Sequence, residues 1–198
     1  MKEVIRKNIE EDEEYLRQIS KEVNFDTDDY KSHIKDVKWY VKNNDIYALA
    51  PVQIGIPKRI IYIKNTNQNM ELNKDRNYNE DIVLINPKIV ESKGHQVFLE
   101  GCHSCKMSKK YLVCEVERPY SIKLKYQDIR GNEKEEIFEE FKAVVLSHEI
   151  DHLDGILHID RGEKIHHFTL DEMKKYRLEN PLKIIDKDKD FCYKEIEK

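Results

Sequence analysis

The chain has 198 residues with 35 basic and 39 acidic side chains, so its formal net charge is -4 and no positive field exists to gather nucleic acid or anionic lipid. No run approaches the roughly 20 apolar residues that span a bilayer, and the opening MKEVIRKNIEEDEE lacks the apolar core of a signal peptide. We therefore expect a cytoplasmic protein that binds neither membranes nor nucleic acid directly, and whose four cysteines stay reduced.

The N-terminal segment is predicted to contain two helices. Residues 10–23 read as a charged helix, and a second helix is predicted to open near Asp26 or Thr27, either of which can cap it. Asn43 and Asn44 are expected to end this second helix. Its apolar stripe at helical spacing consists of Tyr30, Ile34, Val37 and Val41.

Residues 48–127 change to short β-prone runs, which predict an antiparallel sheet. Within this region, residues 65–79 are polar and rich in asparagine and lysine, so we expect them to form a loop. The β-prone runs are residues 59–64, 82–85, 88–90, 96–99, 111–116 and 121–126.

The C-terminal part begins with a predicted buried helix at residues 136–153, where apolar positions are dense, and Gly155 is well placed to end it. The stretch TLDEMKKYRLE around Met173 reads as another helix, and the charged tail from Lys183 is predicted to be a short helix or partly disordered. We therefore expect a catalytic domain at residues 1–165 and a C-terminal helical or partly disordered extension at residues 166–198.

The sharpest chemical signal is the sequence HEIDH at residues 148–152. The imidazoles of His148 and His152 are four residues apart, so they lie on one face of a helix and can hold the same metal ion. Glu149 can then take a proton from a metal-bound water and return it to a leaving group. The alternative is a pair of core histidines, which would bury three polar side chains without compensation. A purely structural metal site is a further alternative, but it would have no use for Glu149.

Two imidazoles leave the metal in need of a third protein ligand, and the sequence offers two candidates. His158 completes HEIDHLDGILH, which matches the pattern of the metzincin zinc proteases. Those proteases also place a methionine turn beneath the metal, whereas the only later methionine, Met173, lies in a predicted helix. The other candidate is Cys102, in the segment EGCHS at residues 100–104.

The chain resembles the peptide deformylases, which carry three marks in a fixed order: a glycine-rich segment that ends in glutamine, then E-G-C-L-S, then H-E-x-D-H-L. The counterparts of these marks are residues 48–55, 100–104 and 148–153. Further agreement in LRQISKEV, IGIPKRI, INPKI and DGILHIDR extends the resemblance over about residues 16–161. The resemblance implies an α+β fold in which antiparallel β-sheets surround a central metal-binding helix.

The same resemblance implies an activity and a cofactor. The activity is hydrolysis of the N-formyl group from N-formylmethionyl peptides or nascent proteins, with release of formate and work near the ribosome. The cofactor is one divalent metal held by Cys102, His148 and His152, with Fe(II) favoured and zinc, nickel or cobalt able to replace it.

The resemblance also implies roles for the residues around the metal. Glu149 is expected to act as general acid and base. Gln53 and the backbone N–H of His103 are expected to donate hydrogen bonds to the oxyanion. Ala48 and Gly101 are expected to contact the substrate.

Several positions depart from the family pattern. Ile46 and Ala48 replace two glycines and would narrow the groove where a peptide pairs with the main chain. Pro51 removes a backbone donor one place earlier than in the family, and the loop after Cys102 is a few residues longer. These departures leave a second hypothesis open, namely a divergent paralogue that keeps the metal site but has a changed substrate or no activity.

The remaining cysteines and one possible ion pair near the motifs have simpler interpretations. Cys102 and Cys105 form a CxxC, but a zinc ribbon needs a second such pair and the sequence has none. Cys105 and Cys114 are therefore predicted to be packing or surface thiols. Glu100 and Arg118 form either an ion pair that helps to orient the cleft or a plain surface pair.

Overall fold

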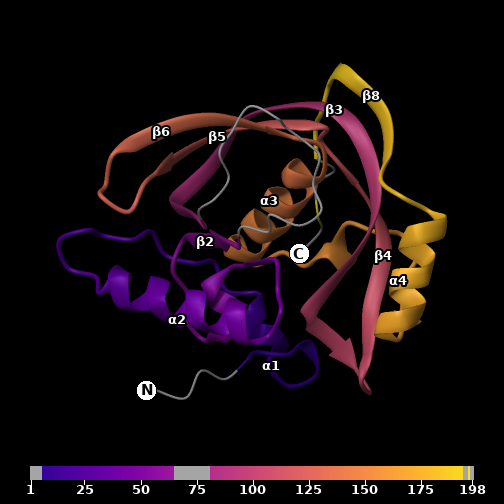
Figure 1. The fold of residues 1–198 in the computed structure, drawn as a ribbon, viewed down its shortest axis with the longest axis horizontal. Coiled ribbons are helices and arrows are strands. Elements are labelled where there is room, and N and C mark those ends of the chain that lie inside the picture. Colours follow the sequence, from indigo (N-terminus) through magenta and orange to yellow (C-terminus); the bar gives the residue numbers. More distant parts are fainter. Residues whose placement is uncertain (1–5, 65–80, 194–195, 197–198) are drawn as a thin grey trace.

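The computed structural model describes residues 6–64, 81–193 and 196, so the loop predicted at residues 65–79 lies outside the described residues. Eight strands form one sheet, and Figure 1 shows this sheet curving around helix α3 (Glu140–Leu153). All pairs between named strands are antiparallel. The predicted α+β class, with antiparallel strands around this helix, is confirmed.

Strand β3 (Ile82–Met107) runs through the whole sheet. Its register shifts beside Pro87, which has no N–H to donate, and again beside Gly94, which has a φ of 68°. These irregularities explain why one long strand reads as three short runs in the sequence. The partners of β3 are β2 (Ile60–Ile63), β4 (Lys110–Arg118), β5 (Ser121–Gln127) and β8 (Lys183–Asp190).

Helix α3 lies at the centre of the core. Its Ile150 and Leu153 belong to one buried apolar cluster with Ile61 of β2 and Leu84 of β3. Because both faces of the helix meet other elements, its apolar and polar residues do not separate into a simple stripe. Gly155 has a φ of 71° and follows the end of the helix, as predicted.

The predicted start of this helix at Glu136 is wrong, because residues before Glu140 form strand β6 (Glu133–Glu139). This strand pairs with β5 along its whole length. Phe138 is buried in the core, whereas the preceding Ile137 is 57% exposed. That alternation has the period of two that a strand requires.

The two N-terminal helices differ from the predicted ones at their ends. Helix α1 spans Ile9–Leu16 and stops before residue 23, because Lys21 forms a parallel β-bridge with Lys58. Helix α2 (Tyr30–Asn43) ends as predicted, but it does not open at Asp26 or Thr27. Its N-cap is Asp29, whose side chain accepts a hydrogen bond from the backbone of residue 32.

The segment after α2 brings a glutamine towards the core. Strand β1 (Ala48–Leu49) pairs with β2, and the short 3-10 helix η1 (Pro51–Ile54) follows it. Pro51 stands at the first position of η1, where a backbone donor is not needed. Gln53 is thereby buried beside β3.

The C-terminal part adds strands as well as a helix. After the 3-10 helix η2 (His158–Asp160), strand β7 (His166–Phe168) pairs with β4. Helix α4 (Leu170–Glu179) confirms the helix predicted around Met173. The prediction of a helical or partly disordered tail is wrong for residues 183–190, which form β8 on the edge of β3. The division at residue 165 into a domain and an extension stays a prediction.

Helix α3 is rich in buried apolar residues. No helix in the described part of the chain is long and apolar enough to cross a bilayer. The apolar residues of α3 instead pack inside the curved sheet.

Candidate active site

Three metal-ligating side chains converge between β3 and α3. Cys102, His148 and His152 each offer one ligand atom, and these atoms all lie within 4.8 Å of one another. The Cys102 Sγ lies 3.2 Å from the Nε2 of His152. The two histidines occupy successive turns of α3, so their rings are neighbours, with centroids 4.9 Å apart.

The environment of Cys102 favours its thiolate form, which is the form that binds metals. A hydrogen bond from the Cys105 thiol lowers the pKa of Cys102 well below its ordinary value, and the neighbouring imidazoles add to the effect. The backbone N–H of Ser104 also donates to the Cys102 sulfur at 3.4 Å. Cys105 and Cys114 are buried free thiols, which confirms packing rather than surface positions.

His158, the other candidate for the third ligand, does not join this group in the described residues. Its Nε2 lies 2.9 Å from the carbonyl oxygen of Leu112. Burial lowers the pKa of His158 to about 4, so its ring is neutral near pH 7. The structure therefore pairs the two imidazoles of α3 with a sulfur and not with a third imidazole.

A buried ion-pair network holds His148 in place. The Nδ1 of His148 lies 2.7 Å from Glu100, which leaves its other ring nitrogen for a ligand. Glu100 accepts two hydrogen bonds from Arg118, at 2.7 and 3.0 Å. Arg118 also donates to Asp151, which binds Arg161 in turn. Glu100 and Arg118 are thus a buried pair next to a candidate ligand, and not the surface pair that the sequence left open.

The charge state of Glu100 follows from this network. Burial would raise the pKa of Glu100, but the charge and hydrogen bonds of Arg118 outweigh that effect and lower it well below its ordinary value. The carboxylate therefore stays ionised and accepts the N–H of His148. This bond fixes the orientation of the imidazole ring.

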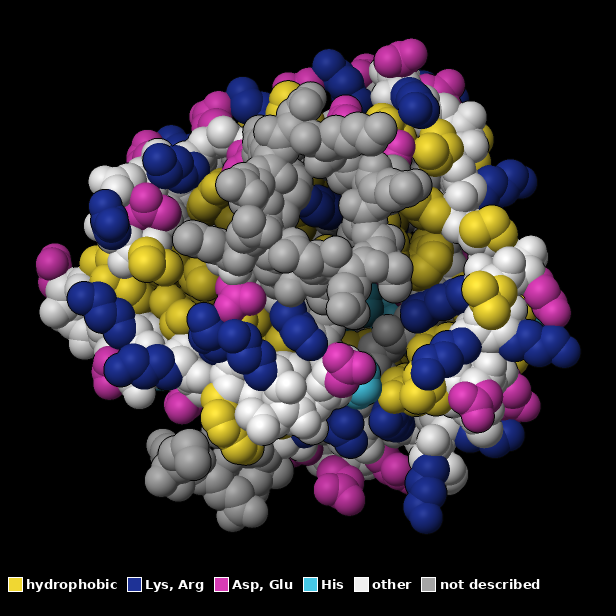
Figure 2. All heavy atoms as spheres, viewed as in Figure 1, with side chains coloured by type: hydrophobic (Ala, Val, Ile, Leu, Met, Phe, Trp, Pro, Cys, Tyr) yellow, Lys and Arg dark blue, Asp and Glu magenta, His cyan; other side chains and the backbone are white. Residues whose placement is uncertain are grey.

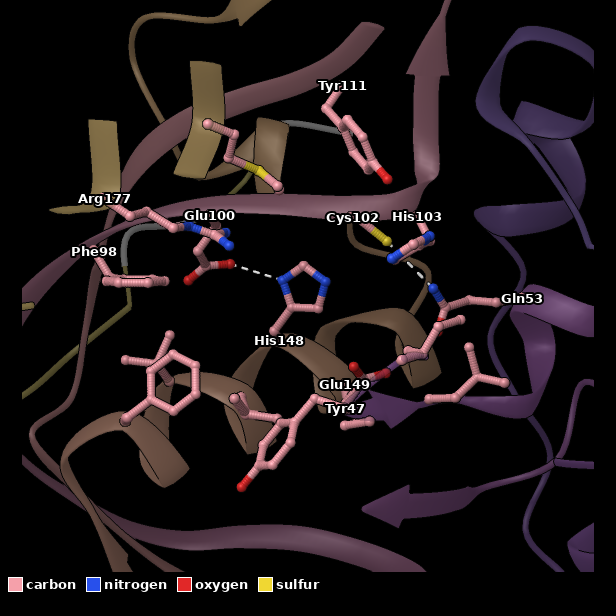
Figure 3. Close-up of a pocket in the computed structure, with 18 of the residues that line it drawn as sticks. Tyr47, Gln53, Phe98, Glu100, Cys102, His103, Tyr111, His148, Glu149 and Arg177 are labelled. Atoms are coloured by element: carbon pink, nitrogen blue, oxygen red, sulfur yellow. Dashed lines mark hydrogen bonds and ion pairs between the residues drawn. The ribbon is translucent and has the colours of Figure 1, made fainter. Parts of the chain in front are cut away.

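Gln53 lies beside Cys102 and His103 in the cavity (Figure 3). Its Nε2 donates to the Cys102 sulfur and to the hydroxyl of Ser104, both at 3.2 Å. Its Oε1 accepts the backbone N–H of Ala50 at 3.1 Å, and this bond sets which end of the amide faces the site.

Glu149 is buried and has a carboxylate oxygen that makes no hydrogen bond to any described residue. Its side chain is 5% exposed, and its Oε2 has no hydrogen-bond partner among the described residues. Burial raises the pKa of Glu149 above that of an ordinary glutamate. A carboxyl group in this condition is suited to accept and release a proton near neutral pH.

A cavity of about 210 Å³ adjoins these groups. It contains the predicted catalytic residues Gln53, His103 and Glu149 and the predicted substrate contacts Ala48 and Gly101 in its lining. Figure 2 shows histidine side chains at the bottom of a hollow, with lysine or arginine side chains on its rim. His103 is only partly buried, and its ring packs against Tyr111.

Several residues that line the cavity are not apparent from the sequence motifs. Phe98 and Phe141 meet edge to face with ring centroids 5.3 Å apart, so one end of the cavity is aromatic. The spacing of aromatic residues in a core strand and a core helix does not show which of them face a cavity. The other cavity residues that the motifs do not indicate include Tyr47, Tyr111, Met173 and Arg177.

Comparisons with known proteins show which proteins this chain resembles over most of its length. A family model described as Polypeptide deformylase matches residues 5–168. A peptide deformylase of Finegoldia magna is 35% identical over 152 residues, which cover 76% of this chain and 85% of that protein. A peptide deformylase of Thermoanaerobacter pseudethanolicus is 36% identical over 163 residues, or 82% of this chain and 90% of that protein.

Solved structures show the same similarity. The crystal structure of peptide deformylase from Thermotoga maritima has a TM-score of 0.68 at 30% identity, and the match covers 83% of this chain and 100% of that one. A peptide deformylase from Synechococcus elongatus in complex with actinonin has a TM-score of 0.66 at 28% identity, with 89% and 85% of the two chains covered.

Proposed function

The chain belongs to the peptide deformylase family, and from this membership we propose that it hydrolyses the N-formyl group of N-formylmethionyl peptides or nascent proteins and releases formate. The observation that carries the proposal is the meeting of one sulfur and two imidazoles beside a buried carboxyl group with an unused oxygen. Work near the ribosome and a cytoplasmic location stay predictions.

Cys102, His148 and His152 would hold the metal. A thiolate and two neutral imidazoles suit a divalent transition metal, and the donor atoms are close enough to share one ion. The family favours Fe(II), while zinc, nickel or cobalt would suit the same donors. When bound, the ion would supply Lewis acidity and lower the pKa of a coordinated water.

Glu149 would move the protons. Its raised pKa allows it to take a proton from the attacking water and to return that proton to the amine nitrogen that leaves. The same carboxyl group therefore serves as base and then as acid, and no second proton carrier is required.

Gln53 and His103 would stabilise the charge that develops on the formyl oxygen. The amide of Gln53 is held with its N–H group towards Cys102, and only the backbone N–H of His103 is required. Ala48 and Gly101, which both line the cavity, would contact the main chain of the peptide.

The direct test is formate release from formyl-Met-Ala by protein loaded with Fe(II) or Ni(II). We expect Glu149→Ala to lower kcat by about a hundredfold or more while the metal content stays unchanged, because the ligands are intact. Formate release at the wild-type rate by this variant would refute the role of Glu149.

A divergent paralogue remains the second candidate, because Ile46 and Ala48 line the cavity where the family has glycines. A smaller groove would weaken peptide binding without disturbing the metal ligands. Full metal occupancy with no turnover of formylmethionyl peptides would support this candidate over the first.

A further inference from the structure

Arg177 reaches the cavity from helix α4, which lies beyond the family match at residues 5–168. Its Nε donates to the carbonyl oxygen of Leu99 at 3.0 Å. Its guanidinium carbon lies 5.0 Å from the ring centre of Phe98, a distance typical of a cation–π contact. Two contacts with β3 therefore fix this side chain at the aromatic end of the cavity.

The terminal nitrogens of Arg177 retain donor capacity. The structure records no ion pair between Arg177 and any other described residue, and its one hydrogen bond uses Nε. Glu100 attracts the guanidinium, but both of its oxygens already bind Arg118 and His148. Burial without a dedicated carboxylate partner lowers the pKa of Arg177. Figure 3 shows its nitrogens directed into the cavity.

The open edge of β3 leads from the metal-ligand group towards Arg177. Gln96 and Val97 pair with β4 on one side and β8 on the other, so these two strands lie on opposite edges of β3. Strand β8 begins at Lys183, opposite Val97, and no described strand continues along that edge past Phe98 to Gly101. An extended peptide can add to such an edge as a further strand.

The direction of a bound peptide follows from the two ends of this edge. Its formylated end must lie near Cys102, where the metal ligands meet. On the other side of Cys102, the side chain of Gln53 is hydrogen-bonded to Ser104 and blocks the path of a peptide. The peptide therefore has to run in the opposite direction, towards Leu99. At roughly 3.3 Å per residue, the third residue of the peptide would arrive beside Leu99 and Arg177.

We propose that Arg177 is a specificity-determining residue that binds a carboxylate side chain on the third residue of the formylated peptide. The proposal rests on the proposed deformylase function. Arginine pairs with a carboxylate through two parallel hydrogen bonds, and the free terminal nitrogens of Arg177 provide such a donor pair. Helix α4 thereby gives this chain a selectivity that its metal site alone does not contain.

The test compares two peptides that differ only in charge, formyl-Met-Ala-Glu-amide and formyl-Met-Ala-Gln-amide. At low salt, we expect the kcat/KM of wild-type protein to be about fivefold higher for the glutamate peptide. This ratio corresponds to the interaction free energy of a partly exposed ion pair. The preference should fall as salt is added, because ions screen the pair.

Arg177→Met should bring the ratio of the two kcat/KM values to about one, since the methionine keeps an apolar stem over Phe98 but carries no charge. Lys175→Met is the matched control, because Lys175 is an exposed cation of the same helix, with a side chain that is 77% exposed. This control should leave the ratio at its wild-type value.

Each outcome decides between separate claims. Equal kcat/KM values for the two peptides in wild-type protein, or equal losses on both peptides in Arg177→Met, would overturn the proposal and leave Arg177 as an anchor for α4. If Arg177→Met does not fold, Arg177→Lys retains the charge and should keep a preference for the glutamate peptide. Failure of wild-type, metal-loaded protein to cleave either peptide would instead refute the proposed function.

Discussion

Arg118 has no exposed surface, and its guanidinium binds the carboxylates of Glu100 and Asp151. Taking such charges out of water is costly, and only their mutual contacts compensate. We expect Arg118→Met to lower the free energy of unfolding by about 3–5 kcal/mol, because it removes the buried cation that binds both Glu100 and Asp151. Urea denaturation of the metal-free proteins measures the difference.

Arg17 provides a matched control for this prediction. It also makes two hydrogen bonds to one carboxylate, that of Asp160, but its side chain is 36% exposed. Arg17→Met should therefore cost less than about 1 kcal/mol. Similar losses for the two variants would show that burial does not set the importance of the Arg118 network.

His158 should make the stability of the fold depend on pH. Its pKa falls from 6.5 to about 4 in the folded protein, so between these values the unfolded chain binds a proton that the folded chain does not. The stabilisation is complete above pH 6.5 and is lost as the pH falls towards 4, at up to about 1.4 kcal/mol per pH unit.

The variant His158→Gln isolates this effect, because glutamine can still donate to the carbonyl of Leu112 but does not titrate. Denaturant unfolding of both proteins at several pH values gives the slope of the free energy of unfolding against pH for each protein. The wild-type slope should be the steeper one below pH 6.5, and parallel slopes would contradict the assignment of a neutral, buried His158.

At the residue scale, the metal-binding group was predictable because its signal is local. His148 and His152 share a helical face through their spacing alone, and the resemblance of the EGCHS segment points to Cys102. Arg177 was not predictable in the same way. It reaches the cavity only because α4 packs beside β3, and no sequence spacing reports that contact.

At the scale of elements, Gly94 lies where strand β8 packs closely against the rest of the sheet. A Cβ on Gly94 would lie 2.6 Å from the Cβ of Tyr120 and 2.7 Å from the carbonyl oxygen of Asp186. We expect Gly94→Ala to destabilise the protein and to loosen β8, which hydrogen exchange of residues 183–190 would detect as faster exchange.

Gly55 is a control that separates the effect of backbone strain on stability from the effect of close contacts. It also has a positive φ, 84°, but among the described residues the only heavy atom within 4 Å of a Cβ added there is a carbon of the Lys7 side chain at 4.0 Å. Gly55→Ala should therefore destabilise the protein only through the strained backbone conformation. Gly94→Ala should lower the free energy of unfolding by at least about 1 kcal/mol more, because its Cβ also meets close neighbours. Equal costs would mean that the backbone, and not the crowding at β8, dominates.

The features that the sequence predicted correctly have a strong local pattern, such as the end of α2 at Asn43, strand β2 and the end of α3 before Gly155. Two errors have physical causes. Strand β6 was merged into a helix because its run EKEEIFE is short and charged, and only its pairing with β5 shows that it is a strand. Strand β8 is exposed along its whole length, so no buried face left a period of two in its sequence.

At the scale of the whole molecule, metal binding should stabilise the fold, because the three ligands come from a strand and a helix that are far apart in the sequence. A ligand present at a thousand times its Kd adds about 4 kcal/mol to the free energy of unfolding. We expect removal of the metal by a chelator to lower Tm, and differential scanning calorimetry measures the change.

Variants of the two candidate third ligands make this prediction specific. Cys102→Ala should abolish the difference in Tm between metal-loaded and chelated protein, whereas His158→Gln should preserve it. The opposite pattern would restore His158 as the ligand and support the metzincin interpretation.

The position of β8 on the edge of β3 has a consequence for the order in which a ribosome makes this chain. Residues 183–190 are translated after every other described strand. The backbone groups of β3 at Lys93–Val97 that pair with β8 therefore stay unpaired until these residues have been made. A waiting strand edge is a template for pairing with a neighbouring chain. Nascent chains that end before residue 183 would thus carry every proposed metal ligand and yet be more prone to aggregate than chains that include β8.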